Sequence, residues 1–154
     1  MKNASRLLWW FLIGASILLL AACPTQPARL NMVLSAASNV NPDSAGQALS
    51  VVIRVYQLKD KGRLETADYN AILKSDRETL SEDYLDRQER VVQPGTIEML
   101  DIKANPSAAY VGVVALFRNP TGDTWRKIIP IKGKSLTIKL SLREQSIELS
   151  SVGK

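Results

Sequence analysis

Side chains that commonly carry catalysis are scarce in this sequence. The chain has 154 residues, a single cysteine at position 23 and no histidine. Without histidine there is no Ser-His-Asp or Cys-His nucleophile pair, no imidazole metal ligand and no imidazole pH switch. Much of enzyme chemistry is therefore excluded, and we expect no metal and no bound cofactor. Cys23 remains as the one residue with a clear chemical role.

The residues before Cys23 have the composition of a secretory signal peptide. Lys2 and Arg6 precede an apolar run from Leu7 to Ala22. This run of about 16 residues is shorter than the roughly 20 that a helix needs to cross a bilayer. A short positive segment followed by such a run predicts a signal peptide over residues 1–22. An uncleaved membrane anchor with an incidental cysteine is the alternative.

The end of the apolar run resembles the bacterial lipobox, since the segment Leu20–Cys23 sets small residues directly before the cysteine. The resemblance implies that the Cys23 thiol receives a diacylglyceryl group and becomes the mature N-terminus. This would explain a lone thiol in an exported protein. Several acyl chains on one cysteine make a permanent anchor. An aspartate directly after the cysteine would resemble the inner-membrane retention signal, but this position is Pro24. We therefore expect the protein to be located at the outer membrane, facing the periplasm.

Residues 23–28 are predicted to be the acylated cysteine and a short tether. The segment Pro24–Ala28 contains two prolines, and five extended residues span at most about 15–18 Å. The domain that follows, residues 29–154, should therefore lie close to the membrane. Such a position suits a docking component better than a diffusing protein.

An acid-rich segment raises the question of carboxylate chemistry. Its members are Asp76, Glu78, Glu82 and Asp83. Paired carboxylates can cleave glycosides or bind hard cations. The alternative, which we favour, is a solvated helix surface beside Lys74, Arg77 and Arg87, because no calcium-type loop accompanies these acids.

Basic and aromatic side chains have similar alternatives. A basic patch for anionic lipid or nucleic acid could be formed by Lys127, Lys132, Lys134 and Lys139. The formal charge is only +5, and removing Lys2 and Arg6 with the signal peptide leaves +3, so a solvated face is favoured and no nucleic-acid partner is expected. Trp125 could stack on a sugar, but beside Ile128 and Ile129 a place in the core is favoured.

Alternating apolar residues predict strands in the first part of the domain. Arg29–Ser35 alternates, and Leu49–Leu58 follows with Val51, Ile53 and Val55 on one face. Between these strands, Ala36–Gly46 is rich in Ser, Asn, Pro and Gly, which predicts a loop. This loop is longer than a hairpin connection, and long loops in small sandwiches often carry function.

A helical insertion is predicted next. Thr66 is expected to cap a helix in which Tyr69, Ile72 and Leu73 form one apolar stripe. Asp76 is expected to cap a second short turn that carries Leu80. After this insertion the strand pattern returns.

The second half of the chain is predicted to be strands throughout. Arg90–Val92 leads to the turn at Pro94–Gly95, and Thr96–Lys103 follows, with Ile97, Met99 and either Leu100 or Ile102 facing the core. The later strands are Ala109–Arg118, Trp125–Ile131, an alternating strand through Leu136, Ile138, Leu140 and Leu142, and a short strand with Ile147 and Leu149.

Three residues or segments refine the positions of these later strands. Ala109–Arg118 is apolar throughout, which is typical of a central strand. Gly112 in its middle indicates a bulge or a close neighbour. Pro130 cannot donate to a ladder, so its strand is expected to be an edge strand or to be bulged there. Seven or eight short strands without alternating helices predict a mainly β fold, an antiparallel β-sandwich.

The order of these segments is similar to that of the type VI secretion system lipoprotein TssJ (SciN-like) family. The segments that carry the resemblance are the lipobox, the Leu-rich first strand, Leu49–Leu58, Ala67–Leu73, Asp76 with Leu80, Pro94–Gly95, Tyr110–Arg118, and Trp125–Arg126 leading to Ile129–Ile131. Together they cover nearly the whole chain.

The resemblance implies a transthyretin-like β-sandwich without enzymatic activity, anchored in the outer membrane by acyl chains. It implies a complex with the periplasmic C-terminal region of the inner-membrane protein TssM, which associates with TssL. In the family, the loop between the first two strands contributes to the TssM contact, and its counterparts here are Asn39, Val40, Asn41, Pro42 and Asp43. Val40 is expected to supply a buried apolar centre for this contact.

Two other functional classes remain open on the sequence. The chain could be a lipoprotein that binds a periplasmic ligand such as a glycan, or one that assists assembly. A cell-wall hydrolase is a third class, which the missing histidine disfavours. A concentrated polar pocket would favour the ligand binder, whereas a flat sandwich with a protruding first loop would favour docking without a small-molecule substrate.

Overall fold

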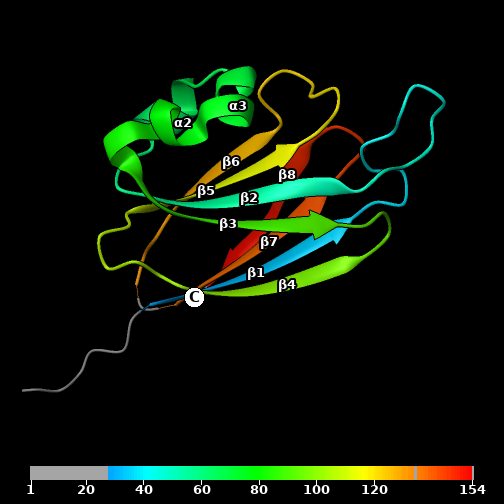
Figure 1. Cartoon of the computed structure of the whole chain (residues 1–154). Coiled ribbons are helices and arrows are strands. Elements are labelled where there is room, and N and C mark those ends of the chain that lie inside the picture. Colours follow the sequence, from blue (N-terminus) through cyan, green and yellow to red (C-terminus); the bar gives the residue numbers. More distant parts are fainter. Residues whose placement is uncertain (1–27, 134, 154) are drawn as a thin grey trace, which may run out of the picture.

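Eight strands form two sheets that pack face to face, with the helices on one side (Figure 1). This computed structural model describes residues 28–133 and 135–153. The strands are β1 (Arg29–Ala36), β2 (Val51–Leu58), β3 (Tyr84–Val92), β4 (Ile97–Lys103), β5 (Tyr110–Leu116), β6 (Arg126–Pro130), β7 (Ser135–Leu142) and β8 (Ile147–Gly153). The helices are α2 (Gly62–Thr66), α3 (Tyr69–Leu80) and the 3₁₀ helix η2 (Ser81–Asp83). The predicted mainly β sandwich is confirmed.

Each sheet has four strands. The first, sheet A, has the order β4-β1-β7-β8, and the second, sheet B, has the order β3-β2-β5-β6. All neighbouring strands are antiparallel except β1 and β7, which run parallel, with Arg29 beside Ser135. The expectation of a wholly antiparallel sandwich was wrong for this pair. Strand β1 begins at the same end of the sandwich at which β6 finishes. The short connection after β6 therefore places the start of β7 at that end, and β7 runs in the same direction as β1.

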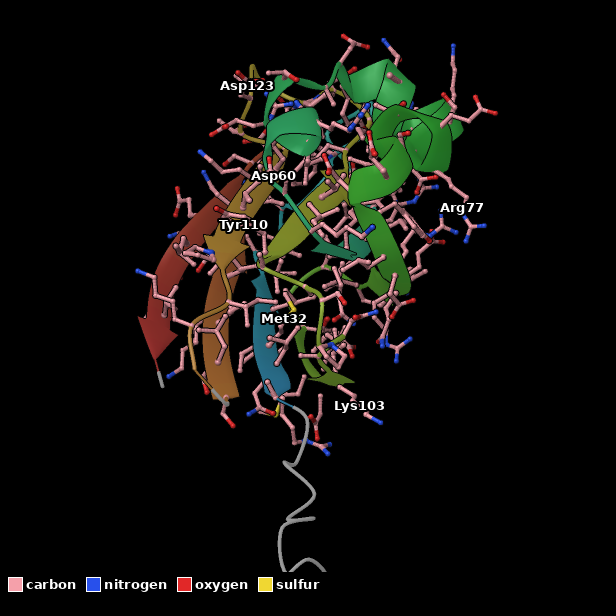
Figure 2. The ribbon with its side chains drawn as sticks, turned by 90° about the vertical axis from the view of Figure 1, so that its left-hand side faces the viewer. Met32, Asp60, Arg77, Lys103, Tyr110 and Asp123 are labelled. Carbon is pink, nitrogen blue, oxygen red and sulfur yellow. The ribbon has the colours of Figure 1, made fainter. Side chains whose placement is uncertain are left out.

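Residues that alternate along the strands build the core between the sheets. Leu30, Met32 and Leu34 of β1 are all buried, and Figure 2 shows Met32 in the interior. The predicted inward set of β7, Leu136 to Leu142, is also buried, as is the predicted core residue Trp125. Each fully buried apolar side chain of this size contributes about 1.5–3 kcal/mol relative to its exposed state.

Strand β5 is central in sheet B, as its apolar sequence predicts. It pairs with β2 on one side and β6 on the other, so Pro130 lies in an edge strand, as expected. Gly112 marks a close neighbour, because a Cβ there would lie 2.3 Å from Cδ2 of Leu64 in α2. The absence of a side chain at this position lets α2 lie directly on the sheet.

The helices cover the outer face of sheet B, and the outer face of sheet A carries none of them (Figure 1). The cap of α3 is Asp68, whose carboxylate accepts from the Asn70 amide at 2.8 Å. The prediction that Thr66 caps this helix was wrong, because Thr66 ends α2 and its hydroxyl donates to the Gly62 carbonyl.

Helix α3 is broken at Ser75, whose φ of −147° and ψ of 50° are not helical. A second short helical segment therefore begins near Asp76, as predicted, and it carries the buried Leu80. The expected apolar stripe is incomplete. Ile72 is buried, but Leu73 is 38% exposed.

In strand β4, the residues that face the core differ in part from those predicted. Leu100 and Ile102 point into the core, whereas Ile97 and Met99 are 63% and 79% exposed. The expectation that Ile97 and Met99 are inside was wrong. Both alternating sets of this strand contain two apolar residues, so hydrophobicity does not decide which set faces the core. The pairing of β4 with β1 decides it.

Strand β3 is longer than the sequence indicated, since only its last residues, Arg90–Val92, were predicted to be extended. It runs from Tyr84 and pairs with β2 along its length, at the edge of sheet B. Its charged residues hide the strand pattern. Glu89 and Arg90, for example, are exposed at this edge.

Candidate functional site: the loop between β1 and β2

The candidate partner-binding loop covers residues 37–50 and leaves β1 at the end of the sandwich opposite to the start of the described chain. Figure 1 shows this loop in cyan beyond the strand ends, far from the first residues of β1. Three other connections end nearby: the turn after β3, the loop between β5 and β6, and the loop between β7 and β8. We call this the loop end, and the end where β1 starts the tether end.

The base of the loop is part of the folded core. Val40 is completely buried, and its backbone bonds to Ala37 and Leu49. The expectation that Val40 forms the apolar centre of an interface was therefore wrong. A side chain that already packs against the core is not available to a partner.

Asn41 fixes the loop to its neighbours. It is 5% exposed and has a positive φ of 51°, a conformation that asparagine tolerates better than most residues. Its side-chain nitrogen donates to the Ser50 carbonyl at 2.7 Å, and its side-chain oxygen accepts from the Arg118 amide at 2.8 Å. Its own amide donates to the Glu144 carbonyl. Asn41 is thus a structural residue that ties three connections together.

The tip of the loop is exposed and shaped by Asp43. One carboxylate oxygen of Asp43 accepts from the amides of Ala45 and Gln47, each at 2.9 Å. The Asp43 amide donates to the Gln47 carbonyl at 2.9 Å, which closes the tip. Ser44 to Gln47 and the separate residue Asn39 are exposed. Of the five predicted contact positions, Asn39 is the fully exposed one, while Pro42 and Asp43 are half-buried.

The acid-rich segment contains a buried carboxylate, that of Asp76, whose ion pairs the sequence did not reveal. Asp76 is 8% exposed, and its carboxylate accepts from the Tyr56 hydroxyl and from Arg87, both at 2.7 Å. Arg54 lies 3.7 Å from the same oxygen. Burial alone would raise the pKa of Asp76, but the bonds from Tyr56 and Arg87 outweigh it, and the pKa is lowered.

This cluster joins α3 to strands β2 and β3, so its role is structural. The expectation of a solvated surface was wrong for Asp76 and right for Glu78 and Glu82, which are exposed. In the part of the chain that the structure describes, no group of three or more metal-ligating side chains comes together. Nor is any helix there long and apolar enough to cross a membrane.

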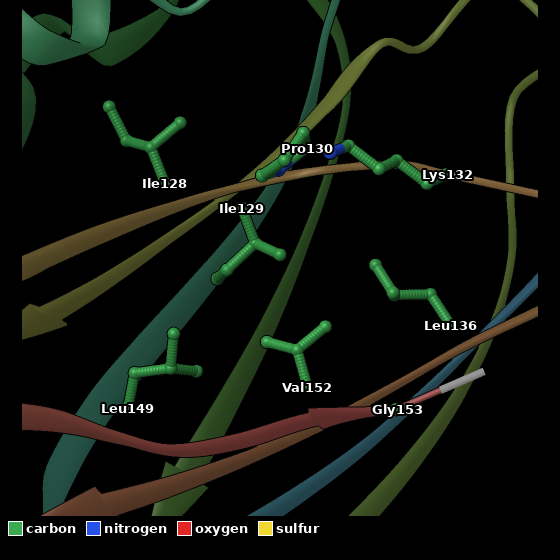
Figure 3. A pocket seen from close by; sticks show the side chains of 8 residues that line it. All are labelled: Ile128, Ile129, Pro130, Lys132, Leu136, Leu149, Val152 and Gly153. Atoms are coloured by element: carbon green, nitrogen blue, oxygen red, sulfur yellow. The ribbon is translucent and has the colours of Figure 1, made fainter.

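A groove of about 340 Å³ opens between β6 and β8 (Figure 3). The residues that line it are Ile128, Ile129, Pro130, Lys132, Leu136, Leu149, Val152 and Gly153. Lys132 is the one charged residue in this set. A glycan site needs several converging polar groups, so the groove does not have the character of a sugar-binding pocket.

Several predicted residues remain to be placed. Cys23, the tether up to residue 27 and Lys134 lie outside the described residues. Lys127, Lys132 and Lys139 come from β6, the connection after it and β7. The lipid on Cys23 and the role of the loop tip therefore stay predictions.

Comparison with known proteins decides the family. A family model described as "Type VI secretion lipoprotein, VasD, EvfM, TssJ" matches residues 28–148. The chain belongs to the type VI secretion lipoprotein (TssJ) family. This family is one of structural lipoproteins and not of enzymes, which confirms the expected lack of enzymatic activity and implies attachment to a membrane.

Solved structures support the same family. The T6SS lipoprotein TssJ1 from Pseudomonas aeruginosa is 29% identical, with a TM-score of 0.76 over 83% of this chain and 98% of that one. A chain of a structure described as "Type VI membrane complex" is 29% identical, with a TM-score of 0.75 over 82% of this chain and 100% of that one.

A third structure is described as "T6SS protein TssM C-terminal domain (869-1107) from EAEC". Its matching chain is 26% identical, with a TM-score of 0.70 over 80% of this chain and 98% of that one. A search of curated proteins gave no significant match.

Proposed function

We propose that this TssJ-family chain is an outer-membrane lipoprotein that docks the periplasmic C-terminal region of TssM, in a complex that includes TssL. Acyl chains on Cys23 would hold the tether end at the membrane, with the domain in the periplasm. The observation that carries the proposal is the position of the β1–β2 loop at the opposite end of the sandwich. A protein approaching from the inner membrane would meet this loop first.

The known structures support TssM as the partner. One family-like chain belongs to a structure described as a type VI membrane complex. Another match comes from the structure named for the TssM fragment 869–1107. The match covers 98% of that chain but only 80% of the 154 residues here, so the matched chain is shorter than the present one. A chain of this size and fold therefore occurs in a structure named for the C-terminal domain of TssM.

The construction of the loop suits protein recognition. Its base is fixed by Val40 and Asn41, and its tip is closed by Asp43. A loop that is ordered before binding loses little conformational entropy when a partner binds. The exposed residues of its tip, Ser44 to Gln47, are uncharged, which fits the surface of a docking site rather than a reactive centre.

The tip can be tested without disturbing the base. Deleting Asn39–Asp43 would also remove the structural residues Val40 and Asn41, so a single change at Ser44 is preferable. Ser44→Arg places a large charged side chain on the exposed tip. We expect it to weaken binding to the periplasmic region of TssM about tenfold or more, because the contact must move or bury the new charge. Isothermal titration calorimetry measures this change.

The matched control is Ser107→Arg, in the exposed connection between β4 and β5 at the tether end. It adds the same charge far from the loop and should leave the affinity unchanged. Equal affinities of Ser44→Arg and the unsubstituted protein would place the TssM contact elsewhere on the domain.

A further inference from the structure

The two most exposed large apolar side chains of the described residues stand next to each other in β4. Met99 is 79% exposed and Ile97 is 63% exposed, both on the outer face of sheet A. Val33 of β1 lies beside Met99 in the strand pairing and is half-buried. We call Val33, Ile97 and Met99 the β4 patch. Exposed apolar groups that cluster in this way are typical of interaction sites.

The surroundings of the β4 patch carry little net charge. On the outer face of the neighbouring strand, Asn31 and Ser35 are uncharged. Toward the tether end, Asp101 forms an ion pair with Arg29, so the two charges compensate. Lys139 of β7 pairs with Val33 on this face, and Glu98 lies between Ile97 and Met99 along β4. A partner surface that fits here is apolar at its centre and weakly charged around it.

Strand β4 is also an edge strand of sheet A. Among the described residues, no strand pairs with the backbone N–H and C=O groups on its outer side. Soluble proteins usually protect such an edge with charges, prolines or a covering element. Here Ile97 and Met99 flank the single charged residue Glu98 along the edge, and none of the described helices lies on this face (Figure 1). The edge therefore has the features of a surface that a partner covers.

The β4 patch is continuous with the base of the β1–β2 loop. Ile97 pairs with Ser35, close to the point where β1 ends. The Ala36 amide donates to the Thr96 carbonyl at 2.9 Å, and the Gly95 amide donates to the Ala37 carbonyl at 3.2 Å. A protein that contacts the loop from the side of sheet A would therefore also meet Ile97 and Met99.

We infer that the β4 patch is the apolar centre of the surface that binds the periplasmic region of TssM. This inference rests on the proposed function and assigns to Ile97 and Met99 the role that the buried Val40 cannot fill. The continuity with the loop and the position away from the tether end favour TssM over the lipid surface. The loop tip then forms the polar rim of the same contact, as in other protein interfaces.

The test uses the full-length protein in mild detergent and the immobilised periplasmic region of TssM. Met99→Lys should weaken binding about tenfold or more, because the lysine charge must be desolvated in the contact. The pair Ile97→Thr with Met99→Thr keeps strand-forming side chains of lower apolar area and should weaken binding in the same direction. Val152→Lys is the matched control: Val152 is 46% exposed on β8, the opposite edge strand of sheet A, and this change should leave binding unaltered.

Each result decides between the two proposals. If the unsubstituted protein binds TssM and both β4 variants bind equally well, the role of the β4 patch is contradicted, whereas the proposed docking function is not. No binding by the unsubstituted protein overturns both. The unsubstituted protein could also prove to be a dimer that Met99→Lys converts to a monomer without loss of TssM binding. This result would contradict the inference, because the β4 patch would then bind a second copy of the chain. Thermal unfolding of each variant verifies that the fold is retained.

Discussion

At the scale of single residues, Asp76 contributes most clearly to the stability of the helical insertion. Its carboxylate accepts bonds from Tyr56 in β2 and Arg87 in β3, so it links α3 to two strands of sheet B. The Asp76 side chain is 12% exposed and that of Arg87 is 35% exposed, so the pair is partly buried. Removing one partner of such a pair destabilises the protein, because it leaves the other charge uncompensated. The cluster is therefore sensitive to both mutation and pH.

The pH dependence follows from the lowered pKa of Asp76 in the folded protein. A carboxyl of this kind stabilises the fold at any pH above its unfolded pKa of about 3.9, and this contribution is lost as the pH falls through the lower folded value. We expect Asp76→Asn to reduce the free energy of unfolding by about 1–3 kcal/mol at pH 7. The difference from the unsubstituted protein should shrink below about pH 4. Urea unfolding between pH 3 and pH 7 measures it.

The control for this prediction is Asp101→Asn. Asp101 forms an ion pair with Arg29, but both side chains are more than half exposed, so solvent screens the pair. Its loss should change stability far less than the loss of Asp76. A pH-independent effect of Asp76→Asn, equal to that of Asp101→Asn, would contradict a structural role for the buried cluster.

At the scale of elements, the contact between α2 and β5 depends on the absence of a side chain. Leu64 is completely buried, and its Cδ2 would lie 2.3 Å from a Cβ at position 112. We expect Gly112→Ala to destabilise the protein by about 1–3 kcal/mol, because the enclosed Leu64 has little room to move. Thermal or urea unfolding measures the effect.

Two comparisons make this prediction specific. Gly153→Ala adds a methyl group where no atom lies within 4 Å and should be nearly neutral. Combining Gly112→Ala with Leu64→Val should cost less than the sum of the two changes, since the smaller valine relieves the crowding and the added methyl group occupies part of the space that the leucine leaves. Additive effects would show that Leu64 is not the source of the strain.

Elements with one clear apolar face could be predicted from the sequence. In β7 only one alternating set is apolar, Leu136 to Leu142, and that set is buried. In β4 both sets contain apolar residues, so the outward orientation of Ile97 and Met99 is decided by the pairing with β1. The charged edge strand β3 showed no alternation over Tyr84–Glu89. Its structure depends on pairing with β2.

The candidate site was harder to predict than the strands. Composition indicated the β1–β2 loop correctly as a loop, but it could not separate its base from its tip. Val40 and Asn41 are buried by contacts with segments distant in the sequence, such as Arg118 and Glu144. Local pattern holds no information on such contacts. The β4 patch was missed for the same reason.

At the scale of the whole molecule, the domain has two ends with different proposed tasks. The eight residues of β1 run from the tether end to the loop end, a distance of about 26 Å at the usual rise per residue. If Cys23 carries the lipid as proposed, a tether of at most about 15–18 Å would leave the end of β1, where the loop begins, within roughly 45 Å of the membrane surface. A partner from the inner membrane would then have to span the remaining distance. This arrangement suits a domain that binds a long periplasmic partner.

The anchor and the docking surface make one joint prediction for Cys23. Cys23→Ser removes the thiol that would carry the lipid, but it leaves the β1–β2 loop and the β4 patch unchanged. We expect the variant to be lost from the outer-membrane fraction while it still binds the periplasmic region of TssM. Without the acyl chains, nothing else proposed here holds the domain at that membrane.

The most direct test of the account is membrane fractionation of cells that also produce the periplasmic region of TssM as a separate soluble protein. With the unsubstituted chain, we expect this TssM fragment to be recovered with the outer membrane. With Cys23→Ser, both proteins should leave that fraction together. A TssM fragment that stays soluble beside the unsubstituted chain, or a Cys23→Ser variant that stays in the outer membrane, would contradict the account.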